Sequence, residues 1–145
     1  MNSAGRQESG VVTVRSTLTQ AETVRHLVIA VERRGMIVFA RIDHAKTAEV
    51  AKVKLRPALL FVFGYPDAEA PLIQKNPLFG LDFPQRMLVW EDEHNAVWIS
   101  YNDPLWLCRR HATSADIYPR LEAVGQSLAG IAAESSGAGS DFARL

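Results

Sequence analysis

The chain has 145 residues, of which 48% are hydrophobic and 22% are charged, and its 16 basic residues balance 16 acidic ones. This size and composition are typical of one globular domain that can bury a core of its own. Because no net charge would attract a polyanion, and because the longest apolar run, PALLFVFGYP, is too short to cross a bilayer, we expect neither a nucleic acid nor a membrane as a partner.

The two ends of the chain are polar and rich in small residues. Residues 1–9 are predicted to be a disordered leader and residues 135–145 a flexible tail, which leaves a single domain at 10–134. The first ten residues, MNSAGRQESG, lack the apolar segment of a signal peptide. The single cysteine, Cys108, excludes an internal disulfide and a CxxC motif. These features predict a cytoplasmic protein.

The first predicted elements are a strand at 11–16 and the amphipathic helix that follows it. Thr19 and Glu22 have the spacing of a capping box, in which each side chain accepts a hydrogen bond from the other residue's backbone N–H. Apolar residues then recur at helical spacing as far as Val31, and Gly35 supplies the left-handed residue that commonly ends a helix.

The middle of the chain alternates between predicted strands and short helices. β-branched and aromatic residues predict a strand at 36–42, and helix-forming residues predict a short helix at 45–53. The continuous apolar run ALLFVFG at 58–64 predicts a central strand that is covered on both faces. A further short helix is expected at 67–76, whereas PLFGLDFP at 77–84 is too rich in proline and glycine to be regular.

The last third of the chain is predicted to form a hairpin with strands at 85–92 and 96–102. Two helices are predicted to follow it, at 104–111 and 116–134. Asp103, followed by Pro104, is expected to cap the first of these helices, and Asp116 the second. Helices and strands are intermixed along the chain. We therefore expect an α+β domain, a mixed or antiparallel sheet of about five strands with helices packed on it.

Four segments, taken in order, resemble the DUF302 family: GMIVFARIDHA, LRPALLFVFGYP, PLFGLDFPQRMLVWED and VWISYNDPLWLCRRH. The resemblance covers roughly residues 11–112, and it implies the TT1751-like α+β fold and a homodimer. It brings no catalytic residues with it. The chain departs from the family pattern where Tyr65 replaces an asparagine and where Glu69 and Ala70 replace Gly-Thr, which would alter any ligand contact made by that loop.

Asp43 and His44 lie side by side at the end of a predicted strand. Adjacent residues of an extended strand point to opposite faces, so the pair is not expected to act as a catalytic dyad. Asp43 is predicted to cap the helix that starts at Ala45. His44 then either packs locally or faces a pocket at the end of the strand, where its imidazole could act as a general acid/base or a metal ligand.

A second group of candidate ligand-binding residues flanks the helix expected after the hairpin. Tyr101 and Asn102 precede this helix, and Arg110 and His111 end it. The ordinary interpretation places Asn102 in a turn and the two cationic residues at the negative end of the helix dipole. If His44 and His111 converge with Arg110 nearby, the group could instead hold a carboxylate, a phosphate or a metal.

Other chemically distinctive residues have structural interpretations. Asp82, in an otherwise apolar segment, is expected to bind backbone N–H groups of its own loop. Cys108 is expected to pack rather than to act as a nucleophile. Phe79, Phe83 and the three tryptophans are expected in the core or in a dimer interface.

No phosphate-binding loop, GxSxG or HExxH motif is present, so a common hydrolase, kinase or dehydrogenase is not expected. The first hypothesis is a small homodimeric domain that acts as a ligand-binding or accessory module. One alternative is an enzyme that uses His44 as general acid/base on a small anionic substrate. Another is haem or metal binding through His44 or His111. The sequence assigns no cofactor.

Overall fold

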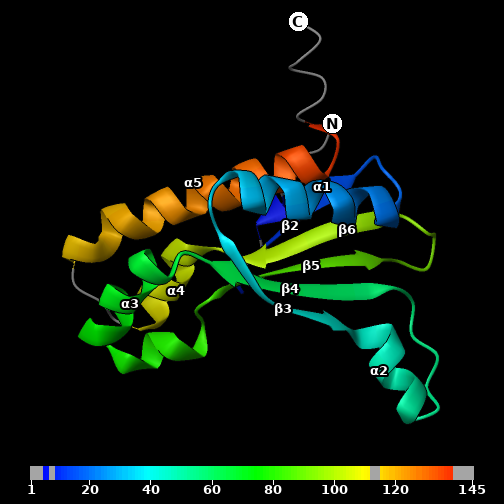
Figure 1. Cartoon of the computed structure of the whole chain (residues 1–145), viewed down its shortest axis with the longest axis horizontal. Helices are drawn as coiled ribbons and strands as arrows, with labels where there is room; N and C mark the ends of the chain where they lie inside the picture. Colours follow the sequence, from blue (N-terminus) through cyan, green and yellow to red (C-terminus); the bar gives the residue numbers. More distant parts are fainter. Residues whose placement is uncertain (1–4, 7–8, 112–114, 139–145) are drawn as a thin grey trace, which may run out of the picture.

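The computed structural model describes residues 5–6, 9–111 and 115–138, and its centre is one sheet with two long helices on one face (Figure 1). The strands are β1 (Gly5–Arg6), β2 (Val11–Ser16), β3 (Ile37–Asp43), β4 (Ala58–Gly64), β5 (Gln85–Glu91) and β6 (Val97–Asn102). The helices are α1 (Gln20–Arg33), α2 (His44–Val50), α3 (Pro66–Lys75), α4 (Pro104–Arg110) and α5 (Tyr118–Ser135), with the 3₁₀ turns η1 (Pro77–Leu81) and η2 (Ala115–Ile117).

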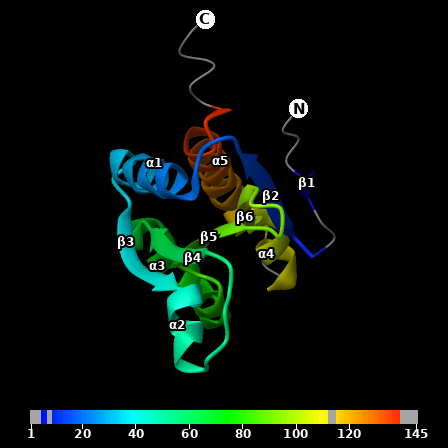
Figure 2. The same ribbon diagram turned by 90° about the vertical axis from the view of Figure 1, so that its right-hand side faces the viewer.

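The sheet has the order β1-β2-β6-β5-β4-β3, and every pair of neighbouring strands is antiparallel. Viewed along the strands, α1 and α5 lie together on one side of the sheet, and α2 extends from the other side (Figure 2). This arrangement confirms the α+β class. Five of the strands are six or seven residues long, and β1 adds a two-residue edge beside β2.

Local sequence signals explain where α1 begins and ends. The Thr19 side chain accepts from the N–H of Glu22 at 3.2 Å, and the Glu22 carboxylate accepts from the N–H of Thr19 at 3.0 Å. After the helix Gly35 has a φ of +73°, and the N–H of Met36 donates to the carbonyl of Val31. The predicted capping box and the predicted glycine stop are both confirmed.

The main core lies between the sheet and the two long helices. Side chains alternate along β4, β5 and β6, so every second residue of these strands faces α1 and α5. Fully buried members of this core are Leu27, Val31, Phe61, Phe63, Met87, Ile99, Leu128 and Ile131. A smaller cluster contains Phe79, Phe83 and Cys108, which confirms that these three residues pack. Burial of each large side chain contributes on the order of 2 kcal/mol.

In the described part of the chain, the opposite face of the sheet carries no long helix, and β4 is not covered on both faces as its sequence predicted. Phe61 and Phe63 are buried, whereas Leu60 and Val62, which alternate with them, are half-buried. The prediction was wrong because apolar side chains also occupy the less covered face of an antiparallel sheet, where neighbouring strands shield them in part.

Two further predictions were wrong. The segment expected to be irregular begins with the turn η1, because the Asn76 side chain caps it by accepting from the N–H of Leu78 at 3.1 Å. Asp116 does not cap α5, whose N-cap is Ile117. The Asp116 carboxylate instead forms an ion pair with Lys75 at the end of α3.

Both ends of the domain differ from their predicted boundaries. Gly5–Arg6 pairs with β2, within the expected leader. At the other end α5 continues to its C-cap Ser136, and the carbonyl of Ser136 accepts from the N–H of Thr17 at 2.9 Å. The other parts of the expected leader and tail, residues 1–4, 7–8 and 139–145, lie outside the described residues.

Candidate functional site

Asp43 and His44 lie where β3 ends and α2 begins. The Asp43 carboxylate accepts from the N–H of Lys46 at 3.0 Å, which confirms that it is the helix cap. His44 is the first residue of α2, and its side chain is exposed. The capping hydrogen bond accounts for the position of the Asp43 carboxylate without a ligand. His44 lies at the surface of a helix that has no buried residue.

The sheet register does not bring His44 together with His111. Asp43, at the end of β3, pairs with Leu59 near the start of β4, whereas β5 starts at the far end of β4, opposite Phe63. β6 also ends on that far side, and α4 follows it there. Figure 1 shows α2 and α4 at opposite ends of the sheet. The convergence considered for the enzyme and metal hypotheses is therefore absent.

The structure instead gathers Arg110 and His111 around Asp82, in a group that we call the Asp82 cluster: Asp82, Arg86, Arg110 and His111. Arg110 Nη1 lies 3.0 and 3.2 Å from the two Asp82 oxygens, and His111 Nε2 lies 2.5 Å from Oδ2. Arg86 Nη2 is 3.6 Å from Oδ1. The Asp82 side chain is only 4% exposed, so the two guanidinium groups and the contact with His111 offset the cost of burying its charge.

This arrangement corrects the prediction that Asp82 binds backbone N–H groups of its own loop. That loop turns back through η1 and contains a cis peptide bond between Phe83 and Pro84, and Asp82 lies beside the end of α4. Its partners are thus the side chains of two arginines and one histidine, from 4 to 29 residues away along the chain. Only tertiary packing determines that proximity.

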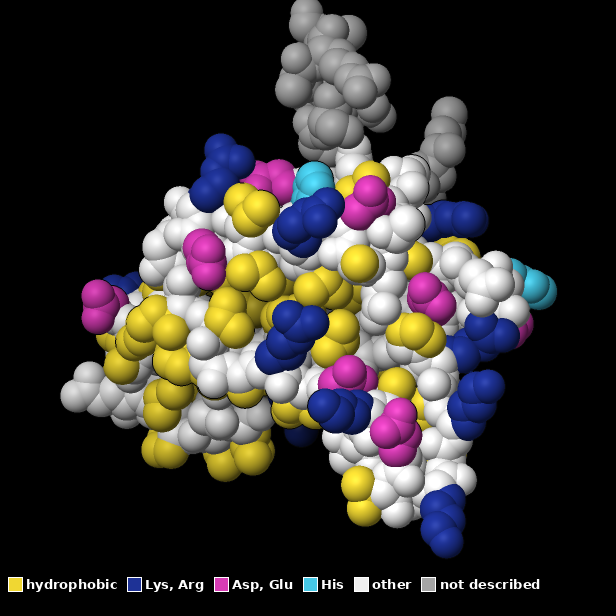
Figure 3. Space-filling model, turned by 45° about the vertical axis from the view of Figure 1, so that its right-hand side comes forward, with side chains coloured by type: hydrophobic (Ala, Val, Ile, Leu, Met, Phe, Trp, Pro, Cys, Tyr) yellow, Lys and Arg dark blue, Asp and Glu magenta, His cyan; other side chains and the backbone are white. Residues whose placement is uncertain are grey.

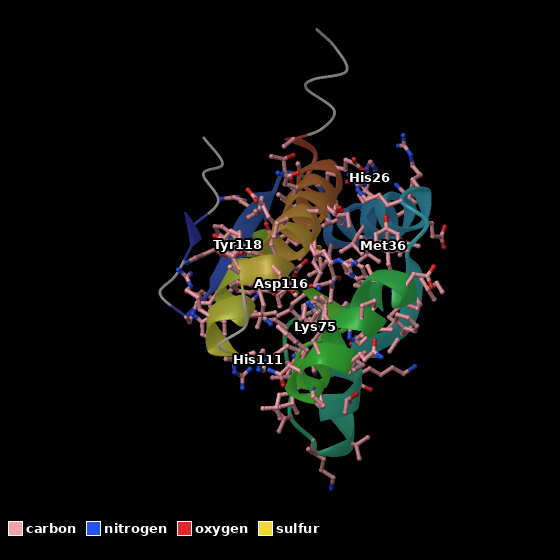
Figure 4. The ribbon with its side chains drawn as sticks, turned by 90° about the vertical axis from the view of Figure 1, so that its left-hand side faces the viewer. His26, Met36, Lys75, His111, Asp116 and Tyr118 are labelled. Carbon is pink, nitrogen blue, oxygen red and sulfur yellow. The ribbon has the colours of Figure 1, made fainter. Side chains whose placement is uncertain are left out.

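Neighbouring elements fix the position of His111 in the cluster. His111 is the C-cap of α4, and its ring centroid lies 4.8 Å from that of Phe79 in η1. Asn76 Nδ2 donates to the His111 carbonyl at 3.4 Å. Figure 4 shows His111 where the end of α4 approaches the segment of α3 and η1. With its ring 5% exposed and Nε2 engaged by Asp82, His111 holds the carboxylate rather than facing solvent.

The two arginines of the cluster retain free hydrogen-bonding capacity. Arg86 and Arg110 are 40% and 48% exposed, and each uses one Nη group, on Asp82 and, for Arg86, also on the carbonyl of Leu81. Among the described residues, no hydrogen bond engages Nε or the second Nη of either guanidinium. Two positive charges thus share one carboxylate, with spare donors of the kind that recognise carboxylate and phosphate oxygens.

A shallow hollow of about 290 Å³ adjoins the cluster on the less covered face of the sheet. We call it the sheet hollow, and its walls are Val11, Leu60, Arg86, Leu88, Ser100, Tyr101 and Asn102. Arg86 belongs to both the hollow and the cluster. Two candidates from the sequence, Tyr101 and Asn102, thus line a hollow that shares Arg86 with the cluster of the other two, Arg110 and His111, while Asp43 and His44 lie elsewhere.

Arg86 is the residue of this site that sequence reasoning missed. It stands second in β5, on the same face as Leu88 and four residues after Asp82. A charged residue on the strand face that otherwise carries Leu88 and Trp90 is the signal that could have found it. No group of three or more potential ligands among His, Cys, Asp and Glu could hold a metal ion in the described part of the chain.

The comparisons with known proteins agree with this architecture. The family model "Domain of unknown function DUF302" matches residues 12–135. The crystal structure of a DUF302 protein from Bacillus stearothermophilus superposes with a TM-score of 0.78 at 16% identity, over 87% of this chain and 98% of that one. At that identity the superposition supports the fold alone.

Two curated relatives are much longer proteins. The chain is 42% identical over 105 residues to the fluoride-specific ion channel FluC 1 of Brucella suis biovar 1 and to its namesake in Brucella abortus biovar 1. The match covers 72% of this chain but only 41% and 39% of those proteins. Within the described residues, no helix of this chain is long and apolar enough to span a membrane. From the family match and the superposed structure together, the chain belongs to the DUF302 family.

Proposed function

We propose that this domain is a small-ligand-binding accessory module, and that its ligand is a small anion held by Arg86 and Arg110. The observation that carries the proposal is the shared use of Asp82 by both guanidinium groups, whose remaining donors have no partner among the described residues. A carboxylate or phosphate group would replace water on those donors without disturbing Asp82.

The sheet hollow supports the proposal by giving the ligand a place for its body. Its apolar walls are Val11, Leu60 and Leu88, and Asn102 and Ser100 add polar groups. Ser100 is already oriented, since its hydroxyl lies 2.9 Å from both Trp90 Nε1 and Thr13 Oγ1. A mainly apolar hollow with a few fixed polar groups and a cationic edge is the usual form of a site for a small organic acid.

The accessory role draws on the curated relatives. In the Brucella proteins, the segment similar to this chain is less than half of a protein named a fluoride-specific ion channel. Such an arrangement fits a domain that serves another protein by binding a small anion near it. Fluoride therefore belongs among the anions to be tested, with chloride as the comparison.

The test is a calorimetric titration of the chain with fluoride, chloride, inorganic phosphate, acetate and citrate. We expect saturable binding of at least one of these anions, and we expect Arg110→Gln to weaken it about tenfold or more, since each charge-assisted contact contributes roughly 1.5–3 kcal/mol. Arg109→Gln is the matched control, because Arg109 is an exposed neighbour on the same helix with no contact to Asp82 among the described residues.

Three results would contradict the proposal. The first is the absence of saturable binding by every anion. The second is an equal loss of affinity in Arg109→Gln and Arg110→Gln, which would indicate general attraction to positive charge rather than a site at Asp82. The third is binding that survives in both variants, which would place the anion elsewhere.

We further propose that the domain works as a homodimer that uses the β3 edge. β3 is the last strand of the sheet, and its outer edge has no neighbouring strand among the described residues. Ile37, Phe39 and Ile42 on it are 50%, 48% and 40% exposed. Figure 3 shows hydrophobic side chains gathered on this face below α1, with charged groups among them. An exposed apolar edge strand of this length is a ready surface for a second copy of the chain.

A further inference from the structure

A second cavity, of about 450 Å³, lies between α3 and α5, on the other side of the sheet from the sheet hollow. We call it the α3–α5 pocket. The pocket is lined by Tyr65, which is the N-cap of α3, and by Asp67 and Leu72 within that helix. From α5 it is lined by Arg120, Val124 and Ser127. None of these residues belongs to the Asp82 cluster, so the pocket is a separate feature of the fold.

Polar contacts link the elements that surround this pocket. The Tyr65 hydroxyl donates to the carbonyl of Arg34, and the Arg34 guanidinium binds both oxygens of Glu134 on α5, at 3.0 and 2.7 Å. At the far end of α3, Lys75 pairs with Asp116 just before α5. Figure 4 shows Lys75 and Asp116 between α3 and the start of α5. These contacts connect the two helices at both ends of the cavity, so the cavity between them is part of the folded structure.

The floor and the rim of the pocket differ in chemistry. Leu72 is buried and Val124 is half-buried, and with the Tyr65 ring they give an apolar floor. Asp67 and Arg120 are exposed and stand in the first turns of α3 and α5. Within the described residues, these two opposite charges form no ion pair with each other or with a third group.

We propose that the α3–α5 pocket binds a zwitterionic amino acid with an apolar or aromatic side chain. Its carboxylate pairs with Arg120, its ammonium group pairs with Asp67, and its side chain lies on Leu72, Val124 and the Tyr65 ring. The volume is in the range of sites that enclose small organic ligands. A ligand with only one charge would leave one rim group unmatched, so charge complementarity selects the zwitterion.

The experiment is a titration of the full chain with L-phenylalanine and L-leucine. Phenethylamine, which lacks the carboxylate, and hydrocinnamic acid, which lacks the ammonium group, are tested in parallel. We expect phenylalanine to bind at least about tenfold more tightly than either analogue, and we expect Arg120→Gln and Asp67→Asn each to remove most of that advantage. Ala123→Trp, which fills the pocket from α5 without changing a charge, should abolish binding.

Independence from the anion site is part of the test. Arg110→Gln should leave phenylalanine binding unchanged, and Arg120→Gln should leave anion binding at the Asp82 cluster unchanged. Circular dichroism and thermal unfolding of each variant check that it is folded. The proposal is overturned if no amino acid binds saturably, if an analogue binds as well as phenylalanine, or if folded Ala123→Trp still binds.

Discussion

At the scale of single residues, Glu69 is the least expected side chain of the fold. It is 7% exposed, and its carboxyl group lies against Gly64 at the end of β4, where a Cβ atom would collide with Oε1. Burial raises the pKa of Glu69 to about 7, from the usual 4.5 of a glutamate side chain. Glycine at position 64 is therefore what lets α3 pack a carboxyl group onto the strand.

This burial predicts a stability profile that depends on pH. Between pH 4.5 and 7 the unfolded chain loses the Glu69 proton while the folded chain keeps it, so the free energy of unfolding should fall as the pH rises. Glu69→Gln removes this titration. Between pH 5 and pH 8, the free energy of unfolding of the variant should rise by about 1–2 kcal/mol relative to that of the original chain.

Urea unfolding at pH 5, 6.5 and 8 measures this difference. Glu49→Gln, at an exposed position on α2, is the control for a general effect of removing one negative charge. A constant stability difference between the original chain and Glu69→Gln across the three pH values would contradict the account of Glu69.

The candidate site shows which properties of a residue the sequence can predict and which contacts it cannot. The sequence indicated that Arg110 and His111 end a helix and that Asp82 needs partners. It could not indicate that they are partners of one another, because 28 and 29 residues separate Arg110 and His111 from Asp82 along the chain and only the folded chain brings them together. The sequence could have indicated Arg86, since it is the charged residue on the face of β5 that carries Leu88 and Trp90, four residues after Asp82.

At the scale of elements, α2 depends strongly on its cap. The helix has seven residues, none of them buried, so tertiary packing contributes little to holding it. Asp43→Ala should cost about 1 kcal/mol of local stability and increase hydrogen exchange throughout α2, whereas Asp43→Asn, which keeps an acceptor, should retain most of the protection. Equal protection in Asp43→Ala and the original chain would show that Asp43 is not what holds the helix.

The sequence predicted the caps and ends of most helices correctly. It did not predict which faces of the strands are packed against other elements. The capping box at Thr19, the caps Asp43 and Asp103 and the stop at Gly35 depend on three or four neighbouring residues, which the sequence displays directly. The covering of β4 depends on which elements pack on each face, and an all-apolar run carries no information about that. Asp116 was misassigned for a related reason, since its partner Lys75 lies on another helix.

At the scale of the whole molecule, the antiparallel register separates the two histidines considered together from the sequence. A strand pattern predicts that β3 and β6 exist, but not that they end on opposite sides of the sheet. The same topology leaves β3 as an edge and one sheet face with only partial cover. The exposed β3 edge and the partly covered face of the sheet are thus consequences of the strand order.

The proposed dimer is tested by the mass of the domain in solution. Phe39→Lys should convert a dimer to a monomer, because it places a charge in the middle of the β3 edge. Ile29→Lys, on α1, is the matched control, since Ile29 is 47% exposed and Phe39 is 48% exposed. Light scattering coupled to size-exclusion chromatography gives the masses. A monomer for the original chain, or a dimer that persists in Phe39→Lys, would contradict the proposed interface.

The central claim is that Arg86 and Arg110, held on Asp82, bind a small anion. The most direct measurement is an NMR titration that follows the side-chain Nε–H signals of the arginines while an anion is added. We predict that the signals of Arg86 and Arg110 move together along one saturable curve while that of Arg109 stays in place. Signals that do not move, or that move linearly and equally at all three arginines, would contradict the claim.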